Sequence, residues 1–203
     1  MLKKIIATTL VTIALIFSGC GDPEGEDRLE AQYAVDQGDN QAAIDLLTSK
    51  ASLSEDEKIL LASAYMGRAG FTIIDTTIAF AQASEGVNAD DLINLKNTLL
   101  SQSTSTAEED LIFAIDTFLK IDIPNDDTNL KLALAFIVKV IILLDSGVPD
   151  AVLAKTANEG FDLALSVSPD ELKQDIADIK NEIDTDLDGE ISSAEIALYT
   201  PYN

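Results

Sequence analysis

The segment LKLALAFIVKVIILL, residues 130–144, constrains the fold most strongly, because it is apolar on nearly every face of a helix. Such a helix belongs either in the core of a protein or in a membrane. It is short for a membrane span, which needs about 20 apolar residues, and it contains Lys131 and Lys139. The two lysines lie on one side of the helix and can reach water there. We therefore expect a central core helix. In an alternative role, the same helix would line an apolar cavity for a lipid or another hydrophobic ligand.

The rest of the chain after residue 27 has the pattern of helices, and no segment alternates in the way of a half-buried strand. We expect helices at about 26–37, 40–50, 55–83, 89–102, 107–121, 127–145, 150–167 and 169–183. Within the third of these, Gly67 and Gly70 are candidate interruptions. The predicted fold class is all-α, with antiparallel helical hairpins over residues 28–180.

Three of these helix starts carry the pattern of a capping box, in which a hydroxyl residue precedes a Glu by three positions. The pairs are Ser54 with Glu57, Thr106 with Glu109, and Ser168 with Glu171. In the last pair Pro169 takes the first helical position, where a missing N–H is tolerated.

The chain is strongly acidic, with 13 basic and 36 acidic residues and a formal charge of −23. This balance argues against binding to nucleic acid, which requires cationic side chains. The chain has no His, so it lacks the usual general base near neutral pH and the commonest metal ligand. It also lacks the glycine-rich nucleotide motifs and the Gly-x-Ser-x-Gly nucleophile elbow. We expect a protein that is not an enzyme.

The N-terminus has the pattern of a secretory signal, with Lys3 and Lys4 before the apolar run 5–17. The run is followed by Ser18, Gly19 and Cys20, the only cysteine in the chain. The motif FSGC resembles the lipobox of bacterial lipoproteins. A lone Cys in an exported protein is otherwise a free thiol or half of a disulfide.

The lipobox resemblance implies that residues 1–19 are a signal peptide and that Cys20 is lipidated after cleavage. The acylated Cys20 would anchor the chain to membrane lipid, with residues 20–27 as an acidic tether. Removing two lysines with the signal leaves a charge of 11 − 36 = −25. In Gram-negative lipoproteins, Asp after the cysteine favours the inner membrane. Because Gly21 stands there, we expect export to the outer membrane, facing the periplasm or the cell surface.

Residues 31–47, AQYAVDQGDNQAAIDLL, resemble a tetratricopeptide repeat. The matching small and apolar positions are Ala31, Gly38, Ala43, Ile44 and Leu47. Part of the pattern recurs 32 residues later, since Tyr65 and Gly70 have the spacing of Tyr33 and Gly38. No third copy is visible, although solenoids of this type generally need three. The resemblance implies tetratricopeptide-like hairpins over residues 28–83. The alternative is a set of ordinary helical hairpins with small residues at their crossings.

Residues 184–195, DTDLDGEISSAE, resemble the calcium loop of an EF-hand over its full length. The resemblance assigns the metal ligands to Asp184, Asp186, Asp188, Glu190, Ser192 and Glu195, with Gly189 at the sharp turn. Oxygen ligands of this kind suit Ca²⁺, which is the cofactor we expect for residues 181–199. Ile191 stands where the family has an apolar residue that pairs with a second loop. No second loop is present in the sequence, which leaves pairing between two molecules open.

Taken together, these features favour a membrane-anchored lipoprotein that acts as a helical scaffold for a protein partner in the cell envelope, with one structural calcium ion. The alternative is an envelope carrier or accessory protein that binds a hydrophobic or small organic ligand for a transport system.

Overall fold

The structure, a computed structural model, describes residues 23–73, 75–76, 79, 89–168 and 170–199. These residues are helical or lie in turns and loops, and no strand occurs among them. The all-α prediction is therefore confirmed. The helices are α2 (Pro23–Asp36), α3 (Asn40–Thr48), α4 (Glu55–Arg68), α6 (Ala89–Gln102), α7 (Ala107–Phe118), α8 (Asp126–Leu143), α9 (Asp150–Val167), α10 (Asp170–Ile183) and α11 (Ser193–Ile196).

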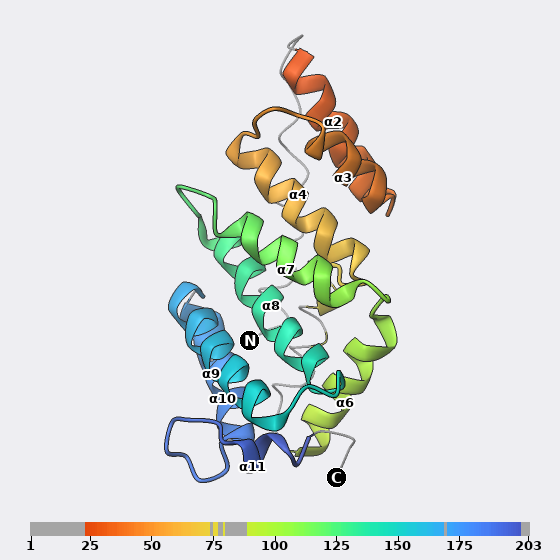
Figure 1. The fold of residues 1–203 in the computed structure, drawn as a ribbon. Coiled ribbons are helices and arrows are strands. Elements are labelled where there is room, and N and C mark those ends of the chain that lie inside the picture. The colour runs from red at the N-terminus through yellow and green to blue at the C-terminus, as the bar shows by residue number, and fades with distance from the viewer. Residues whose placement is uncertain (1–22, 74, 77–78, 80–88, 169, 200–203) are drawn as a thin grey trace.

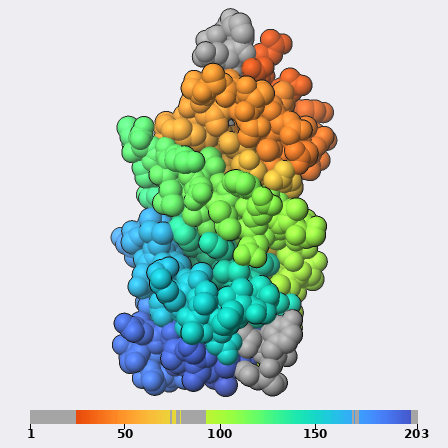
Figure 2. Space-filling model, in the orientation of Figure 1, coloured from red at the N-terminus to blue at the C-terminus, as the bar shows by residue number. Residues whose placement is uncertain are grey.

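The helices form an elongated stack in which the order along the chain largely follows the long axis (Figures 1 and 2). At one end α2 and α3 form a hairpin that packs on α4. Helix α4 packs on α7, α7 on α8, and α8 on α9. At the other end α9 contacts α10 and α11, while α6 contacts α8 and α10.

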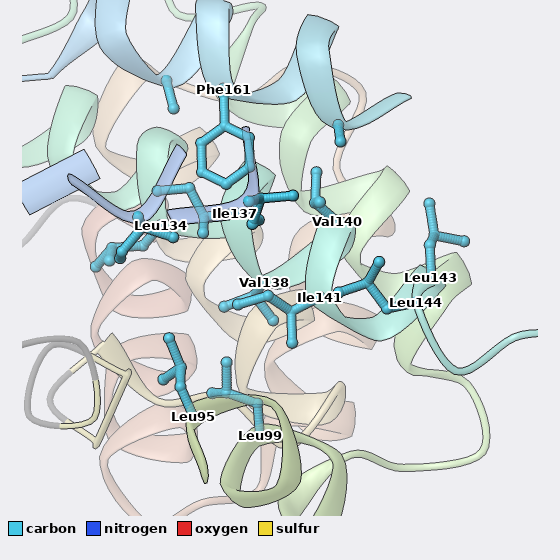
Figure 3. Packing of buried hydrophobic residues seen from close by; sticks show 14 of the residues in the cluster. Leu95, Leu99, Leu134, Ile137, Val138, Val140, Ile141, Leu143, Leu144 and Phe161 are labelled. Atoms are coloured by element: carbon cyan, nitrogen blue, oxygen red, sulfur yellow. The ribbon is translucent and has the colours of Figure 1, made fainter. Parts of the chain in front are cut away.

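Helix α8 is buried on two opposite sides, which explains why its sequence is apolar all round. Leu132 and Ala135 join a cluster with Phe118 of α7 and Met66 of α4. Other α8 residues, among them Ile137, join the main core with side chains of α6 and α9 (Figure 3). The prediction of a central core helix at 130–144 is confirmed. No helix in the described part of the chain has the length and hydropathy to cross a bilayer.

Of the three predicted capping boxes, the one at α4 is present. Ser54 and Glu57 bond each other's backbone N–H groups. The prediction of a capping box at α7 is wrong, because Thr106 makes no side-chain cap bond. Its hydroxyl instead donates to the Asp110 carboxylate, 2.8 Å away. At Ser168 the hydroxyl donates to the Ala164 carbonyl at the end of α9. Residue 169 and the side chain of residue 171, which the third box requires, lie outside the described residues.

The Tyr-x4-Gly recurrence marks two helix ends of the same construction. Gly38 and Gly70 follow α2 and α4 with φ values of +78° and +100°. In each case the Gly N–H donates to the carbonyl three residues earlier, and the next N–H donates to the carbonyl five residues earlier. This is the Schellman pattern of helix termination, for which Gly is preferred. A shared helix cap thus accounts for the recurrence without a sequence repeat.

The small residues of the N-terminal hairpin differ in their roles. Ala31 and Ala43 are fully buried, as the tetratricopeptide resemblance implies for close helix crossings. Gly38 is not at a crossing, because a Cβ added there would meet nothing within 4 Å. The close approach of α3 to α4 occurs at Gly67, where an added Cβ would lie 2.5 Å from the Asn40 side chain.

Two predicted boundaries differ from the structure. The third helix, expected over 55–83, ends at Arg68, because Gly70 terminates it. Helix α2 begins at Pro23 and so includes residues 23–27, which were assigned to the tether; proline suits the first helical position. The signal peptide 1–19 and Cys20 lie outside the described residues.

Two glycines with the same cap geometry allow a matched prediction. Substituting Ala at Gly38 places a side chain in left-handed backbone and should cost about 1–2 kcal/mol of unfolding free energy. The same change at Gly70 should cost clearly more, because the added Cβ would also overlap the Gln102 carbonyl oxygen. Denaturant unfolding of Gly38→Ala and Gly70→Ala measures the difference. Equal losses would contradict the described contact between Gly70 and the end of α6.

The buried Glu57 predicts a pH-dependent contribution to stability. Its carboxylate accepts hydrogen bonds from Lys50 Nζ at 2.6 Å, and from Ser54 N and Oγ at 2.8 and 2.9 Å. Burial raises the pKa of Glu57, but these donors outweigh burial and hold the pKa below its ordinary value. The stabilisation is therefore present above the unfolded pKa of about 4.3 and is lost as the pH falls through the lowered folded value.

Accordingly, Glu57→Gln should lower the free energy of unfolding at pH 7 by about 1–3 kcal/mol. The difference from the unmodified chain should shrink as the pH falls below about 4. Unfolding curves measured from about pH 3 to about pH 7, a range that spans the ordinary pKa of Glu, test this pH dependence. The control is Glu30→Gln on the exposed face of α2, which should show a small effect at every pH.

Candidate metal centre

The loop between α10 and α11 lies at the end of the stack opposite α2 (Figure 1) and brings three acidic side chains together. Asp184, Asp186 and Asp188 each offer one carboxylate oxygen, and these oxygens lie within 4.8 Å of one another. Asp184 is buried, whereas Asp186 and Asp188 are exposed. The cluster is therefore bounded by the protein interior at Asp184 and is open to solvent at Asp186 and Asp188. It could hold a metal ion.

The backbone of the loop curls around these carboxylates through local hydrogen bonds. Asp186 Oδ1 accepts from the Asp188 N–H at 3.2 Å, and Asp188 Oδ1 accepts from the Glu190 N–H at 2.9 Å. Such bonds from an Asp to the amide two residues on are typical of tight turns. Gly189 has φ +93°, in agreement with its predicted place at the sharp turn, and Leu187 also has a positive φ of 56°.

Asp184 carries an oxygen that the protein does not satisfy. Asp184 is 1% exposed, and its Oδ2 accepts the Gly189 N–H at 2.8 Å. Its Oδ1 is buried and has no hydrogen-bond partner within the described part of the chain. A buried carboxylate oxygen without a partner is costly, and a cation is the partner that such an oxygen prefers. The residues of the cluster thus fit a bound cation.

The electrostatics of the cluster also favour a cation. The Asp188 amide lowers the pKa of Asp186, but partial desolvation and the nearby carboxylates of Asp188, Glu195 and Asp184 outweigh it, so the pKa lies above the ordinary Asp value. The negative charges in this loop repel one another. A divalent cation would turn that repulsion into attraction.

Glu195 is held by hydrogen bonds and is not part of the three-carboxylate cluster. Its Oε1 accepts from the Thr185 N–H and hydroxyl and from the Asp186 N–H. Its Oε2 accepts from the Ser192 N–H and hydroxyl, which completes a capping box at the start of α11. The Ser192 N–H is the largest cause that holds the pKa of Glu195 to about 2, against the effect of burial. Glu195 is therefore a buried carboxylate that ties the two ends of the loop together.

Of the six predicted ligands, the structure brings together Asp184, Asp186 and Asp188. The Ser192 hydroxyl bonds Glu195 as a helix cap, and the Glu190 side chain is exposed. Coordination by Glu190, Ser192 and Glu195 stays a prediction. The lipidation site Cys20 lies outside the described residues.

The loop is joined to the rest of the protein by contacts that sequence reasoning did not find. Ile191 and Ile196 are buried in the main core. The Tyr199 hydroxyl donates to the Glu182 carbonyl at 3.0 Å, and Lys96 Nζ of α6 donates to the Tyr199 carbonyl at 2.8 Å. Asn158 of α9 bonds the backbone of Ile191 in both directions. The residues in these contacts lie up to about a hundred positions apart in the sequence, so no local sequence pattern predicts them.

No family model, curated protein or solved structure matches this chain.

Because the carboxylates of this loop repel one another, removing one of them should have opposite effects on the melting temperature without and with a bound cation. In a chelator, Asp186→Asn should melt at a higher temperature than the unmodified chain, because it removes one of the repelling charges. In millimolar calcium the order should reverse, because the variant loses a ligand while the unmodified chain gains about 1–2 kcal/mol from binding.

The matched control for this reversal is Glu190→Gln, which removes the same charge from the same loop but leaves the backbone carbonyl of residue 190 in place. It should keep the calcium-dependent rise in melting temperature. Thermal melts of the unmodified chain and the two variants, with chelator and with calcium, test this prediction. If Asp186→Asn gains as much from calcium as the unmodified chain, the carboxylates at 184–188 do not form the site.

Proposed function

We propose that this chain is a lipid-anchored protein of the bacterial envelope, a helical scaffold for a protein partner whose C-terminal end is clipped by one calcium ion. The observation that carries the calcium part of the proposal is Asp184: its buried Oδ1 has no hydrogen-bond partner among the described residues, and its carboxylate clusters with those of Asp186 and Asp188. An ion there satisfies the orphaned oxygen and relieves the repulsion. Its role is structural, since it stabilises a loop whose ends already belong to the core.

Calcium is the ion that the donor set favours. The cluster offers only carboxylate oxygens, and the chain has no His, which zinc and copper sites commonly use. Mg²⁺ demands compact octahedral geometry and retains water, whereas Ca²⁺ accepts flexible oxygen cages. For an unpaired loop in an extracellular setting we expect a dissociation constant of about 10⁻⁴–10⁻³ M. One calcium ion per chain should bind in calorimetry, and Asp184→Ala or Glu195→Gln should abolish that binding.

The anchor would hold one particular end of the stack at the membrane. Only residues 21 and 22 separate Cys20 from the start of α2 at Pro23, a reach of about 11 Å at most. The loop between α10 and α11, residues 184–192, which we call the metal loop, lies at the opposite end of the stack (Figure 1). With a mature charge of 11 − 36 = −25, the body would be repelled by anionic headgroups. We therefore propose that the calcium-clipped end points away from the bilayer.

The scaffold has exposed apolar side chains near the anchored end. Leu29 and Tyr33 stand one helical turn apart on α2 and are 41% and 67% exposed. An open groove lined by Tyr33 and Tyr65 would also favour a scaffold, but Tyr65 stacks on the Phe113 ring, with the ring centroids 5.3 Å apart, and the Arg68 guanidinium lies over the Tyr65 ring. We propose that the α2 face, and not a groove between the two tyrosines, contacts the protein partner.

The carrier alternative depends on an apolar cavity beside α8. Figure 3 shows Phe161 of α9 pointing toward Ile137, and Leu95 and Leu99 of α6 toward Val138 and Ile141. These side chains belong to one packed cluster of buried residues. We prefer the scaffold because the described neighbours of α8 pack on it from both sides.

Mass spectrometry of the mature protein tests the anchor, and affinity purification tests the scaffold. We expect an acylated Cys20 at the N-terminus, and a specific partner recovered from solubilised envelopes. Tyr33→Ser should reduce that recovery, whereas the control Val152→Ser, at another half-exposed apolar position, should not. An unmodified Cys20, or equal recovery with both variants, would contradict the respective part of the proposal.

A further inference from the structure

Asn158 of α9 makes an unusual two-way contact with the metal loop. Its side-chain Nδ2 donates to the Ile191 carbonyl at 2.9 Å, and its Oδ1 accepts the Ile191 N–H at 2.8 Å. Nδ2 also donates to the Ala154 carbonyl at 3.0 Å within the same helix, which fixes the orientation of the amide. One side chain thus satisfies both backbone groups of a loop residue 33 positions away.

The bonding pattern is that of two paired strand residues, which exchange both of their N–H···O bonds. Ile191 is the residue through which the loop would pair with a second EF-hand loop. Here the side-chain amide of Asn158 takes the place of that second backbone. The Ile191 side chain is 2% exposed and packs in the main core, so it too is occupied within the molecule. A second copy of the chain is not needed to complete the loop.

The contact also controls the direction of a predicted ligand. The Ile191 N–H and the Glu190 carbonyl belong to the same peptide unit, and no cis peptide occurs in the described residues. In a planar trans peptide the C=O and the N–H point in opposite directions. By holding the N–H, Asn158 turns the Glu190 carbonyl away from α9. The neighbouring Glu190 N–H is in turn held by Asp188 Oδ1.

We propose that Asn158 is the positioning residue of the metal loop: it replaces the missing second loop, orients the Glu190 carbonyl and couples ion binding to α9 within a monomer. This inference rests on the proposed calcium site. It follows that calcium affinity depends on a helix residue that touches no ion, and that calcium stabilises the packing of α9.

The test is calcium titration by calorimetry on the full chain purified in detergent. Asn158→Leu removes both bonds to Ile191 and should weaken calcium binding about tenfold or more, the range for residues that orient metal ligands. The matched control is Phe161→Leu, one turn along α9 in the same core, which should lower the melting temperature without changing calcium affinity by more than about twofold. If Asn158→Leu does not fold, Asn158→Ala removes the same bonds without added bulk.

Equal affinity in Asn158→Leu and the unmodified chain would overturn the inference, and so would an equal loss in Phe161→Leu, since the effect would then be one of general stability. Sedimentation with saturating calcium should show a monomer, and a calcium-dependent dimer would overturn the inference as well. These outcomes are distinct from failure of the proposed function, in which the unmodified chain itself would bind no calcium.

Discussion

The fold depends on the burial of α8 between two groups of helices. One side of α8 packs with α4 and α7, and the other packs with α6 and α9. Gly160 of α9 lets that helix approach closely, since an added Cβ would lie 2.8 Å from a Val140 methyl group. Burial of apolar surface on both sides of one helix links the two ends of an elongated molecule into one structure. The N-terminal hairpin forms its own cluster with α4, and α4 is joined to α8 through the cluster that contains Met66.

This acidic chain has few basic residues, and several of them form ion pairs between neighbouring helices. Arg68 of α4 makes a bidentate contact with Asp110 of α7, a carboxylate that is fully buried. Lys180 of α10 pairs with Asp162 of α9 at 2.9 Å. A buried carboxylate requires such a partner, whereas the many exposed acids require only water. Among the described residues, the buried acids Asp184 and Glu195 of the metal loop form no ion pair with a basic residue, and in our proposal a metal ion supplies the missing positive charge.

The metal loop is part of the main core and is not an appendage. Ile183, Ile191 and Ile196 belong to the same cluster as the central residues of α8. Glu195 ties the start of the loop to its end, and Asn158 ties its middle to α9. An ion bound at Asp184 would therefore act on a segment that is already ordered by packing. This arrangement suits a clip that holds one structure better than a switch between two.

Local chemistry in the sequence determined the all-α class, the buried character of residues 130–144, the cap at Ser54 and the turn at Gly189. Each of these follows from residues within a few positions of one another, because helix caps, turns and amphipathic faces are short-range features. The three clustered aspartates belong to the same group, since the spacing of a single loop brings them together.

Only the tertiary structure decided the rest. Thr106 matched the capping pattern, yet its hydroxyl bonds the carboxylate of Asp110, which is buried and also binds Arg68. The glycines of the Tyr-x4-Gly recurrence looked like parts of a repeat, and they are helix caps, one of which also lies against the end of α6. No local pattern singles out Asn158, because the backbone that its side chain bonds belongs to Ile191, 33 residues further along the chain. The sequence predicted a calcium loop, but only the packing of the core placed α9, with Asn158, beside that loop.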